Sequence, residues 1–196
     1  MRRAIFGGSF NPVHNDHIKL ALQLADEFGL DKVTMIPTYV TPLKDNSAIA
    51  DGMHRFRMCQ LAVEGRPQLE VSDIELRRGG MSYTSDTILA LKNDADELFL
   101  IVGADMYVTL DQWHEFRTIF ENATILVAPR NELDYNSLEE KYNEYKPYGC
   151  RTLISRNYVG PLSSTAVRSA VKAGQPISEM VDCRVEEYIK SHELYR

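Results

Sequence analysis

The 196-residue chain has few cysteines and no long apolar run. Its three cysteines, Cys59, Cys150 and Cys183, are odd in number and far apart, so they form neither a zinc pattern nor a disulfide framework. We interpret them as buried free thiols in a reducing compartment. No stretch approaches the ~20 apolar residues of a membrane helix. The first residues reach Gly7 before forming an apolar segment long enough for a signal peptide, so we expect a cytoplasmic protein without a membrane partner.

Basic residues are fewer than acidic ones: the chain has 22 Lys and Arg against 28 Asp and Glu, and its net charge is −6. A surface that binds nucleic acid usually carries a basic excess, so we expect no nucleic-acid partner. This balance still allows a local basic pocket for a small phosphate ligand. The length is that of one domain over residues 1–196, with a small helical C-terminal part over roughly residues 160–196. A domain of this size buries about 70% of its unfolded surface and needs no disulfide or structural metal.

Short apolar runs alternate with helical patterns along the chain. The runs predict strands at residues 3–6, 33–36, 69–76, 98–102, 124–128 and 151–154. The helical patterns lie at residues 15–28, 53–63, 83–92, 163–171 and 184–191. This order predicts an α/β, doubly wound (Rossmann-like) parallel sheet with helices on both faces, whose ligands bind at the carboxyl ends of the strands. The acidic, tyrosine-rich residues 131–148 are interpreted as a partly helical, solvated surface element.

The segment after the first predicted strand has the composition of an anion site. Gly7 and Gly8 allow close backbone approach of a ligand, and the following helix offers N–H groups and a partial positive charge at its N-terminus. His14 and His17 are three residues apart and project from one side of its first turn, which suits a polyphosphate. The alternatives are surface histidines in a turn and a zinc site, but zinc lacks a third His or Cys at a telling spacing.

A second segment, residues 162–168, has a similar character. Ser163 or Ser164 can cap the helix that follows Pro161, and Arg168 returns to the same face one turn after Ser164. A hydroxyl, free N–H groups and a guanidinium then converge on one point. Ordinary helix capping is the alternative interpretation. Together with the histidine segment, we interpret this one as a second phosphate clamp.

At these two segments the sequence resembles the HxGH nucleotidyltransferases, whose two ATP-binding motifs are similar to residues 7–17 and 163–168. Three further stretches, residues 41–44, 80–87 and 103–113, resemble the bacterial nicotinate-nucleotide adenylyltransferases, and residues 185–195 match them in pattern. The likeness runs in one order from the first strand to the last helix. It implies transfer of the AMP part of ATP to nicotinate mononucleotide, with release of pyrophosphate, in NAD biosynthesis.

The resemblance implies two sets of binding residues. His14, His17 and Arg168 would be catalytic, and the C-terminal helical part would complete the ATP site. The implied ATP-binding residues are Gly7, Gly8, Ser9, Phe10, His17, Gly103, Asp105, Ser163, Ser164, Thr165 and Arg168. The implied mononucleotide-binding residues are Ser9, Lys44, Tyr83, Thr84 and Trp113.

For some of these residues a purely structural role is the alternative to ligand binding. Asp105 would bind the ribose or adenine of ATP, but a carboxylate at a strand end also caps helices. Lys44 would reach phosphate from a loop, or be a solvated lysine. The indole of Trp113 would stack on the pyridine ring, while N–H groups near Thr84 would take its carboxylate; a core position is the alternative for this only tryptophan.

The implied chemistry needs placement and electrostatic stabilisation rather than a covalent nucleophile. Mg²⁺ would arrive with ATP, and we expect no metal site built by the protein. The expected partners are ATP and nicotinate mononucleotide, while the oligomeric state stays open, a homo-oligomer included. The alternative functions are a sister transferase acting on nicotinamide mononucleotide, pantetheine phosphate or a phosphorylated polyol, a binding module that has lost catalysis, and an unrelated phosphate-binding α/β protein.

Asp16 departs from the pattern, because the family usually has glycine there. Its charge would lie where a triphosphate should bind, which predicts repulsion of ATP. It would also stabilise the first turn of its helix by ~0.3–1 kcal/mol. The alternative is that the side chain swings outward and serves only the helix.

Overall fold

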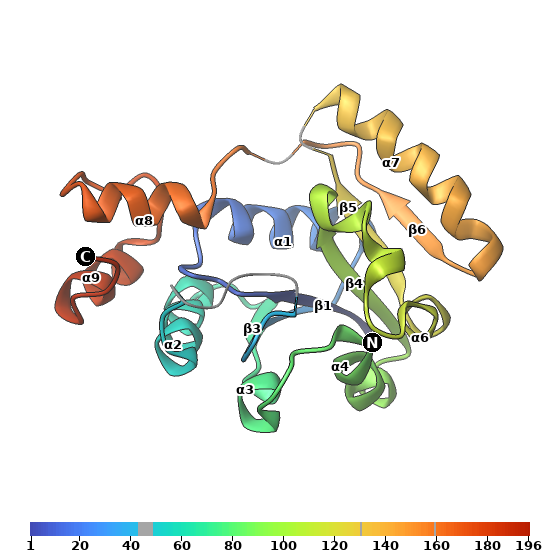
Figure 1. The fold of residues 1–196 in the computed structure, drawn as a ribbon, viewed down its shortest axis with the longest axis horizontal. Helices are drawn as coiled ribbons and strands as arrows, with labels where there is room; N and C mark the ends of the chain where they lie inside the picture. Colours follow the sequence, from blue (N-terminus) through green and yellow to red (C-terminus); the bar gives the residue numbers. More distant parts are fainter. Residues whose placement is uncertain (43–48, 130, 159) are drawn as a thin grey trace.

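A six-stranded parallel sheet forms the centre of the computed structural model, which describes residues 1–42, 49–129, 131–158 and 160–196 (Figure 1). The strands are β1 (Arg2–Gly8), β2 (Lys32–Pro37), β3 (Leu69–Val71), β4 (Glu97–Gly103), β5 (Thr124–Ala128) and β6 (Arg151–Ile154). Their order is β3-β2-β1-β4-β5-β6, and each neighbouring pair is parallel. The order reverses at β1 and β4, the point at which such sheets bind ligands beyond their carboxyl ends.

Helices connect these strands. They are α1 (Asn15–Phe28), α2 (Gly52–Val63), α3 (Ile74–Arg78), α4 (Thr84–Leu91), α5 (Ala104–Tyr107), α6 (Phe116–Asn122), α7 (Glu132–Tyr145), α8 (Ser164–Lys172) and α9 (Cys183–Ser191), with 3₁₀ turns η1 (Lys92–Asp94), η2 (Leu110–Gln112) and η3 (Lys146–Tyr148). In Figure 1, α8 and α9, orange to red, lie at the left, and α7 lies at the upper right. No helix among the described residues is both long and apolar enough to cross a bilayer.

Each strand sends alternate side chains to two separate cores, as strand geometry requires. Ala4 and Phe6 of β1 pack with α1, α2, α8 and α9, whereas Ile5 between them packs with α4, α5, α6 and α7. Strand β4 repeats this, with Ile101 in the first core and Leu100 in the second. The sheet therefore has helices on both faces, and the predicted doubly wound fold is confirmed.

Helix α1 has the predicted bounds because its sequence contains both end signals. Its buried face carries Ile18, Ala21 and Leu24 at helical spacing. Gly29 ends it in the left-handed conformation, with φ 60° and ψ 48°, and its N–H donates to the carbonyl of Ala25.

The predicted strand at residues 69–76 is wrong beyond Val71. Ser72 Oγ accepts a hydrogen bond from the N–H of Ile74 at 3.3 Å, and Asp73 accepts one from Arg77 Nε at 2.8 Å. These local side-chain bonds favour a helical turn over a sheet ladder. Residues 74–78 accordingly form α3, which carries Glu75 into the interior.

Two other expectations need correction. Residues 131–148 are more than a solvated element, because α7 buries Leu138 and Tyr145, each 1% exposed, in the second core. Cys59 and Cys150 are buried free thiols, but Cys183 is exposed at the start of α9. Short α5, η2 and α6, between β4 and β5, were not predicted.

Removing the hydroxyl of Tyr145 should destabilise the fold by about 1–2 kcal/mol, because it leaves a buried acceptor without its donor. That hydroxyl lies 3.0 Å from the carbonyl oxygen of Tyr107 and 3.1 Å from Asp111 Oδ1. Urea unfolding of Tyr145→Phe tests this. The control is Tyr148→Phe, since Tyr148 is 47% exposed. Equal unfolding midpoints for both variants would show that this hydroxyl does not stabilise the fold.

Candidate active site

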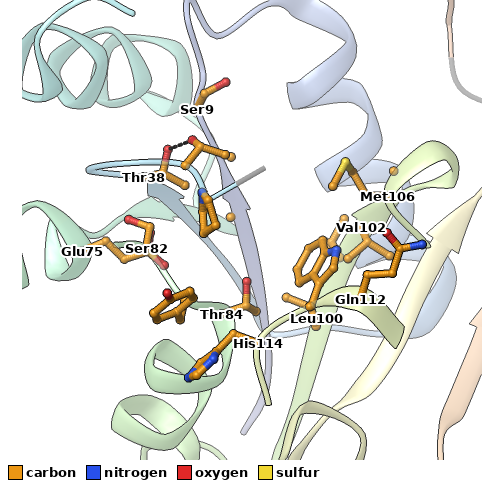
Figure 2. A pocket seen from close by; sticks show the side chains of 18 residues that line it. Ser9, Thr38, Glu75, Ser82, Thr84, Leu100, Val102, Met106, Gln112 and His114 are labelled. Carbon is orange, nitrogen blue, oxygen red and sulfur yellow. Dashed lines mark hydrogen bonds between the residues drawn. The ribbon is translucent and has the colours of Figure 1, made fainter. Parts of the chain in front are cut away.

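Two cavities meet at the carboxyl ends of β1 and β4. The larger, about 490 Å³, lies between the β1–α1 loop, α5 and the start of α8. The smaller, about 390 Å³, lies between the ends of β1 and β4, the start of α4 and the segment after α5 (Figure 2). Both are lined by Gly7, Gly8, Ser9, Gly103 and Met106. Two different ligands could therefore touch at this shared wall.

The loop after β1 exposes backbone to both cavities. A side chain at Gly7 would meet nothing within 4 Å, whereas one at Gly8 would meet the Phe10 ring at 3.1–3.4 Å. Phe10 itself is 1% exposed and has a φ of 43°, an unusual value for a residue with a side chain. Its ring packs edge-on against Phe6 and His17. The Phe10 ring thus packs against the buried side of the loop, and the loop's backbone faces the cavities.

The two predicted imidazoles lie together on the wall of the larger cavity, with ring centroids 3.6 Å apart. His17 Nδ1 accepts a hydrogen bond from the N–H of His14 at 3.2 Å, so Nε2 is the nitrogen that carries a proton to donate. Burial lowers the pKa of His14 to about 4, opposed by the negative charge of Asp16, and this ring is neutral at pH 7. Among the described residues, no group of three His, Cys, Asp or Glu could hold a metal ion.

The start of α8 forms the opposite wall of the same cavity. Ser163 caps the helix by accepting a hydrogen bond from the N–H of Ala166 at 3.2 Å. Ser164 Oγ donates to the carbonyl of Pro12 at 2.8 Å, and Thr165 also lines the cavity. Arg168 donates to the carbonyl of Asn11 at 2.8 Å. The structure therefore brings together the two predicted phosphate segments.

Asp105 lies on α5 beside the larger cavity, where its side chain is exposed. A Cβ at Gly103 would lie 2.8 Å from Asp105 Oδ1, so the glycine leaves room for this carboxylate at the end of β4. Asp105 is thus accessible to a ligand in the cavity. The predicted Lys44 falls outside the described residues.

The smaller cavity combines aromatic rings with a helix N-terminus. Trp113 is half-buried; it lines this cavity and also packs against the second core. Tyr83 stacks on His114 with centroids 4.0 Å apart. Helix α4 begins at Thr84 without a side-chain cap, so the N–H groups of its first turn lack acceptors within the helix. This cavity suits a flat ring that carries an anionic group.

Arg55 belongs to none of the sequence motifs that predict the site, and its guanidinium is buried, with the residue 1% exposed. It donates to three carbonyls, those of Ser9 at 2.8 Å, Thr38 at 2.7 Å and Ala50 at 2.8 Å. It therefore fixes the loops after β1 and β2 relative to α2. An arginine inside a helix looks like a solvated residue, and only tertiary contacts show otherwise.

Glu75 is a buried carboxyl on α3 that the sequence does not indicate, because its segment has the alternating pattern of a strand. It lines the smaller cavity, accepts a hydrogen bond from Thr87 Oγ1 at 2.6 Å, and is 4% exposed. Burial raises its pKa, and hydrogen bonds from Thr87 and Ser82 oppose that shift. Figure 2 shows Glu75 and Ser82 side by side at the cavity edge. The pair organises the segment that leads to Thr84.

The fold is that of an α/β nucleotide-binding protein, and both cavities lie at the switch point of its sheet, where such proteins bind their ligands. The family model for cytidylyltransferase-like proteins matches residues 5–170. The chain therefore belongs to the cytidylyltransferase-like family.

Individual relatives are similar over their whole length. A "Probable nicotinate-nucleotide adenylyltransferase" from Desulfatibacillum aliphaticivorans is 33% identical over 100% of both chains. One of the same name from Herpetosiphon aurantiacus is 36% identical over 99% of this chain and 98% of its own. The fold is similar to that of Plasmodium falciparum nicotinic acid mononucleotide adenylyltransferase complexed with NaAD, with a TM-score of 0.78 at 15% identity over 99% of this chain and 97% of the other.

The low pKa of His14 should make the protein less stable as the pH falls from about 6.5 toward 4. The unfolded chain protonates this imidazole near its ordinary value, while the folded protein resists protonation. The contribution of the neutral His14 ring to the free energy of unfolding is fully present above the ordinary pKa of histidine. Up to about 3 kcal/mol of it is lost as the pH falls through the pKa of His14 in the folded protein. Urea unfolding between pH 7.5 and 4.5 should give a flatter profile for His14→Asn. His192→Asn, at an exposed histidine, is the control. Parallel profiles for wild type and His14→Asn would contradict this.

Proposed function

We propose that the protein is a nicotinate-nucleotide adenylyltransferase. It transfers the adenylyl group of ATP to nicotinate mononucleotide, giving the deamido dinucleotide of NAD biosynthesis and pyrophosphate. The observation that carries the proposal is the pair of adjoining cavities. One is built from phosphate-binding groups, the other from aromatic rings and an uncapped helix N-terminus, and they share Gly7, Gly8 and Ser9.

The larger cavity takes ATP. Its two walls carry the phosphate-binding groups, and Asp105 at the end of β4 is placed to meet the ribose or adenine. The cavity-lining residues that we assign to ATP are Gly7, Gly8, Ser9, Phe10, His14, His17, Gly103, Asp105, Ser163, Ser164, Thr165 and Arg168. Helices α8 and α9 pack on the first core, which supports a single domain whose C-terminal part completes the ATP site.

The smaller cavity takes nicotinate mononucleotide. Trp113 offers an indole face to the pyridine ring, and the first turn of α4 offers N–H groups to its carboxylate. Tyr83 and Thr84 form the adjacent wall, and Ser9 lies at the boundary with ATP. The mononucleotide's phosphate then meets the α-phosphate of ATP at the shared wall.

The reaction is an in-line displacement at the α-phosphorus of ATP. An oxygen of the mononucleotide's phosphate attacks, and the bond to the bridging oxygen of pyrophosphate breaks. The Nε2–H group of His17 and the guanidinium of Arg168 donate to phosphate oxygens as negative charge develops on them. The neutral ring of His14 holds His17 in this orientation by stacking. The protein contributes positioning and electrostatic stabilisation, with no covalent intermediate.

Mg²⁺ fits this site as part of the ATP complex. In the described part of the chain, no group of three or more His, Cys, Asp or Glu side chains could hold a metal ion. We expect phosphate oxygens and water to supply most of the ligands of Mg²⁺, as is usual for Mg²⁺ bound with a nucleotide. When bound, the cation neutralises part of the triphosphate charge. The expected ligands are therefore Mg²⁺-ATP and nicotinate mononucleotide.

Nicotinate mononucleotide should be converted with a kcat/KM about tenfold to a hundredfold higher than nicotinamide mononucleotide. Helix N–H groups that face a carboxylate are poorly paired when an amide replaces it, and such charge-assisted bonds are worth ~1.5–3 kcal/mol. Pyrophosphate release with each acceptor and Mg²⁺-ATP measures the ratio. Phosphopantetheine is the negative control. Equal values for the two pyridine nucleotides would reject nicotinate specificity while leaving adenylyl transfer intact.

Replacing His17 by Ala should lower kcat by about a hundredfold to a thousandfold, the range for losing a donor to the transition state. Stability should fall by only about 1 kcal/mol, through the lost bond to the N–H of His14. Arg168→Ala should chiefly raise the KM for ATP. His192→Ala, at an exposed ring outside both cavities, is the matched control. Near-normal turnover of His17→Ala would remove the histidine pair from the mechanism.

A further inference from the structure

Helix α1 binds the crossover that leads from β6 to α8 through a polar stripe. The stripe consists of Asp16, Gln23 and Glu27, which are spaced to lie on one face of the helix. Glu27 accepts hydrogen bonds from Ser155 Oγ at 2.5 Å and from the N–H of Arg156 at 3.0 Å. Gln23 Nε2 donates to Ser155 Oγ at 3.2 Å. These bonds hold the beginning of the crossover.

Asp16 holds the other end of the crossover. Its Oδ2 accepts a hydrogen bond from the N–H of Leu162 at 2.9 Å, and its Oδ1 lies 3.8 Å from Lys19 Nζ. The side chain is 12% exposed, which excludes the outward orientation considered from the sequence. Its charge is also partly balanced by these two donors, which weakens the argument from repulsion of ATP.

The Asp16 carboxylate occupies the space next to the Cα of Gly160 where a side chain would begin. A Cβ at this position would lie 2.8 Å from Asp16 Cγ, 2.9 Å from Oδ1, and closer still to Oδ2. Real Cβ atoms are essentially never found so close to another heavy atom. A side chain at position 160 would require the carboxylate to shift from the position in which it accepts the bond from Leu162. The two positions therefore depend on each other.

The bond from Leu162 to Asp16 lies next to the ATP-binding end of α8. Leu162 directly precedes the cap residue Ser163, and Asp16, Gly160 and Leu162 all line the larger cavity. From α8, Arg168 reaches back to the loop that precedes α1. The carboxylate thus fixes the entry of α8 relative to the histidine pair on α1.

We propose that Asp16 is a positioning residue that holds the phosphate clamp of α8 against the first turn of α1, and that Gly160 is required by its carboxylate. This rests on the proposed function of the larger cavity as an ATP site. It predicts that Asp16 improves ATP binding, the opposite of the repulsion expected from the sequence.

Steady-state kinetics of Asp16→Ala and Asp16→Asn separate positioning from charge. Asp16→Ala should raise the KM for ATP about tenfold, as expected when a charge-assisted hydrogen bond is lost. Its kcat and its KM for nicotinate mononucleotide should change by less than about threefold. Asp16→Asn keeps an oxygen that accepts from Leu162, so its KM for ATP should stay within about threefold of wild type. Tighter ATP binding by either variant, or an unchanged KM in Asp16→Ala, would overturn the proposal.

Glu27→Ala is the matched control, because it removes a carboxylate that holds the same crossover at its other end. It should lower the melting temperature and leave the KM for ATP within about twofold of wild type. An equal rise in this KM for Glu27→Ala and Asp16→Ala would show general loosening of the crossover and would reject a specific role for Asp16.

A thermal double-mutant cycle tests the pair without using activity. Gly160→Ala should lower the melting temperature by several degrees in the wild-type background and by less than about one degree in Asp16→Ala. Equal losses in both backgrounds would overturn the mutual requirement. Calorimetric titration with Mg²⁺-ATP gives the affinities directly. If the wild type binds ATP but does not use nicotinate mononucleotide, the proposed function fails, while the titrations and the cycle still decide the role of Asp16.

Discussion

The loop from Ser9 to His14 depends on donors that lie outside it. Its backbone turns sharply after β1, so its carbonyls cannot join the sheet and need other partners. Arg55 donates to Ser9, Ser164 to Pro12, and Arg168 to Asn11. Helices α2 and α8 therefore fix this loop from two sides, and the loop in turn places the two histidines.

Buried positive charge makes this arrangement strong and also specific. Burial lowers the pKa of Arg55, yet a guanidinium stays protonated in proteins, so its planar donors bind carbonyls in fixed directions. Arg168 has a different status, because it is only half-buried and lines the larger cavity. Its guanidinium donates to the carbonyl of Asn11 and also lines the cavity. Arg55 thus serves the loops alone, whereas Arg168 both supports the loop and faces the cavity.

Much of the site could be predicted from the sequence because its residues are grouped in short segments. The phosphate loop, the pair His14 and His17, and the cap with Arg168 each follow from local spacing and helix geometry. Trp113 and Thr84 could be placed only through resemblance to a family. Glu75 and His114 could not be found, and the partners of Arg55 could not be placed, because all three residues make contacts with segments distant in the sequence.

The sequence by itself determined the succession of the six strands, the parallel sheet and the end of α1 at Gly29, since apolar periodicity and turn residues act over a few neighbours. Helices α3, α5 and α6 did not follow from it. Only the tertiary structure decided what Asp16 does. From the sequence, its charge predicted repulsion of ATP or a role in its own helix. In the folded protein the carboxylate accepts a hydrogen bond from Leu162, 146 residues away. Contacts between residues this distant depend on how the sheet arranges its helices, and no local pattern contains that information.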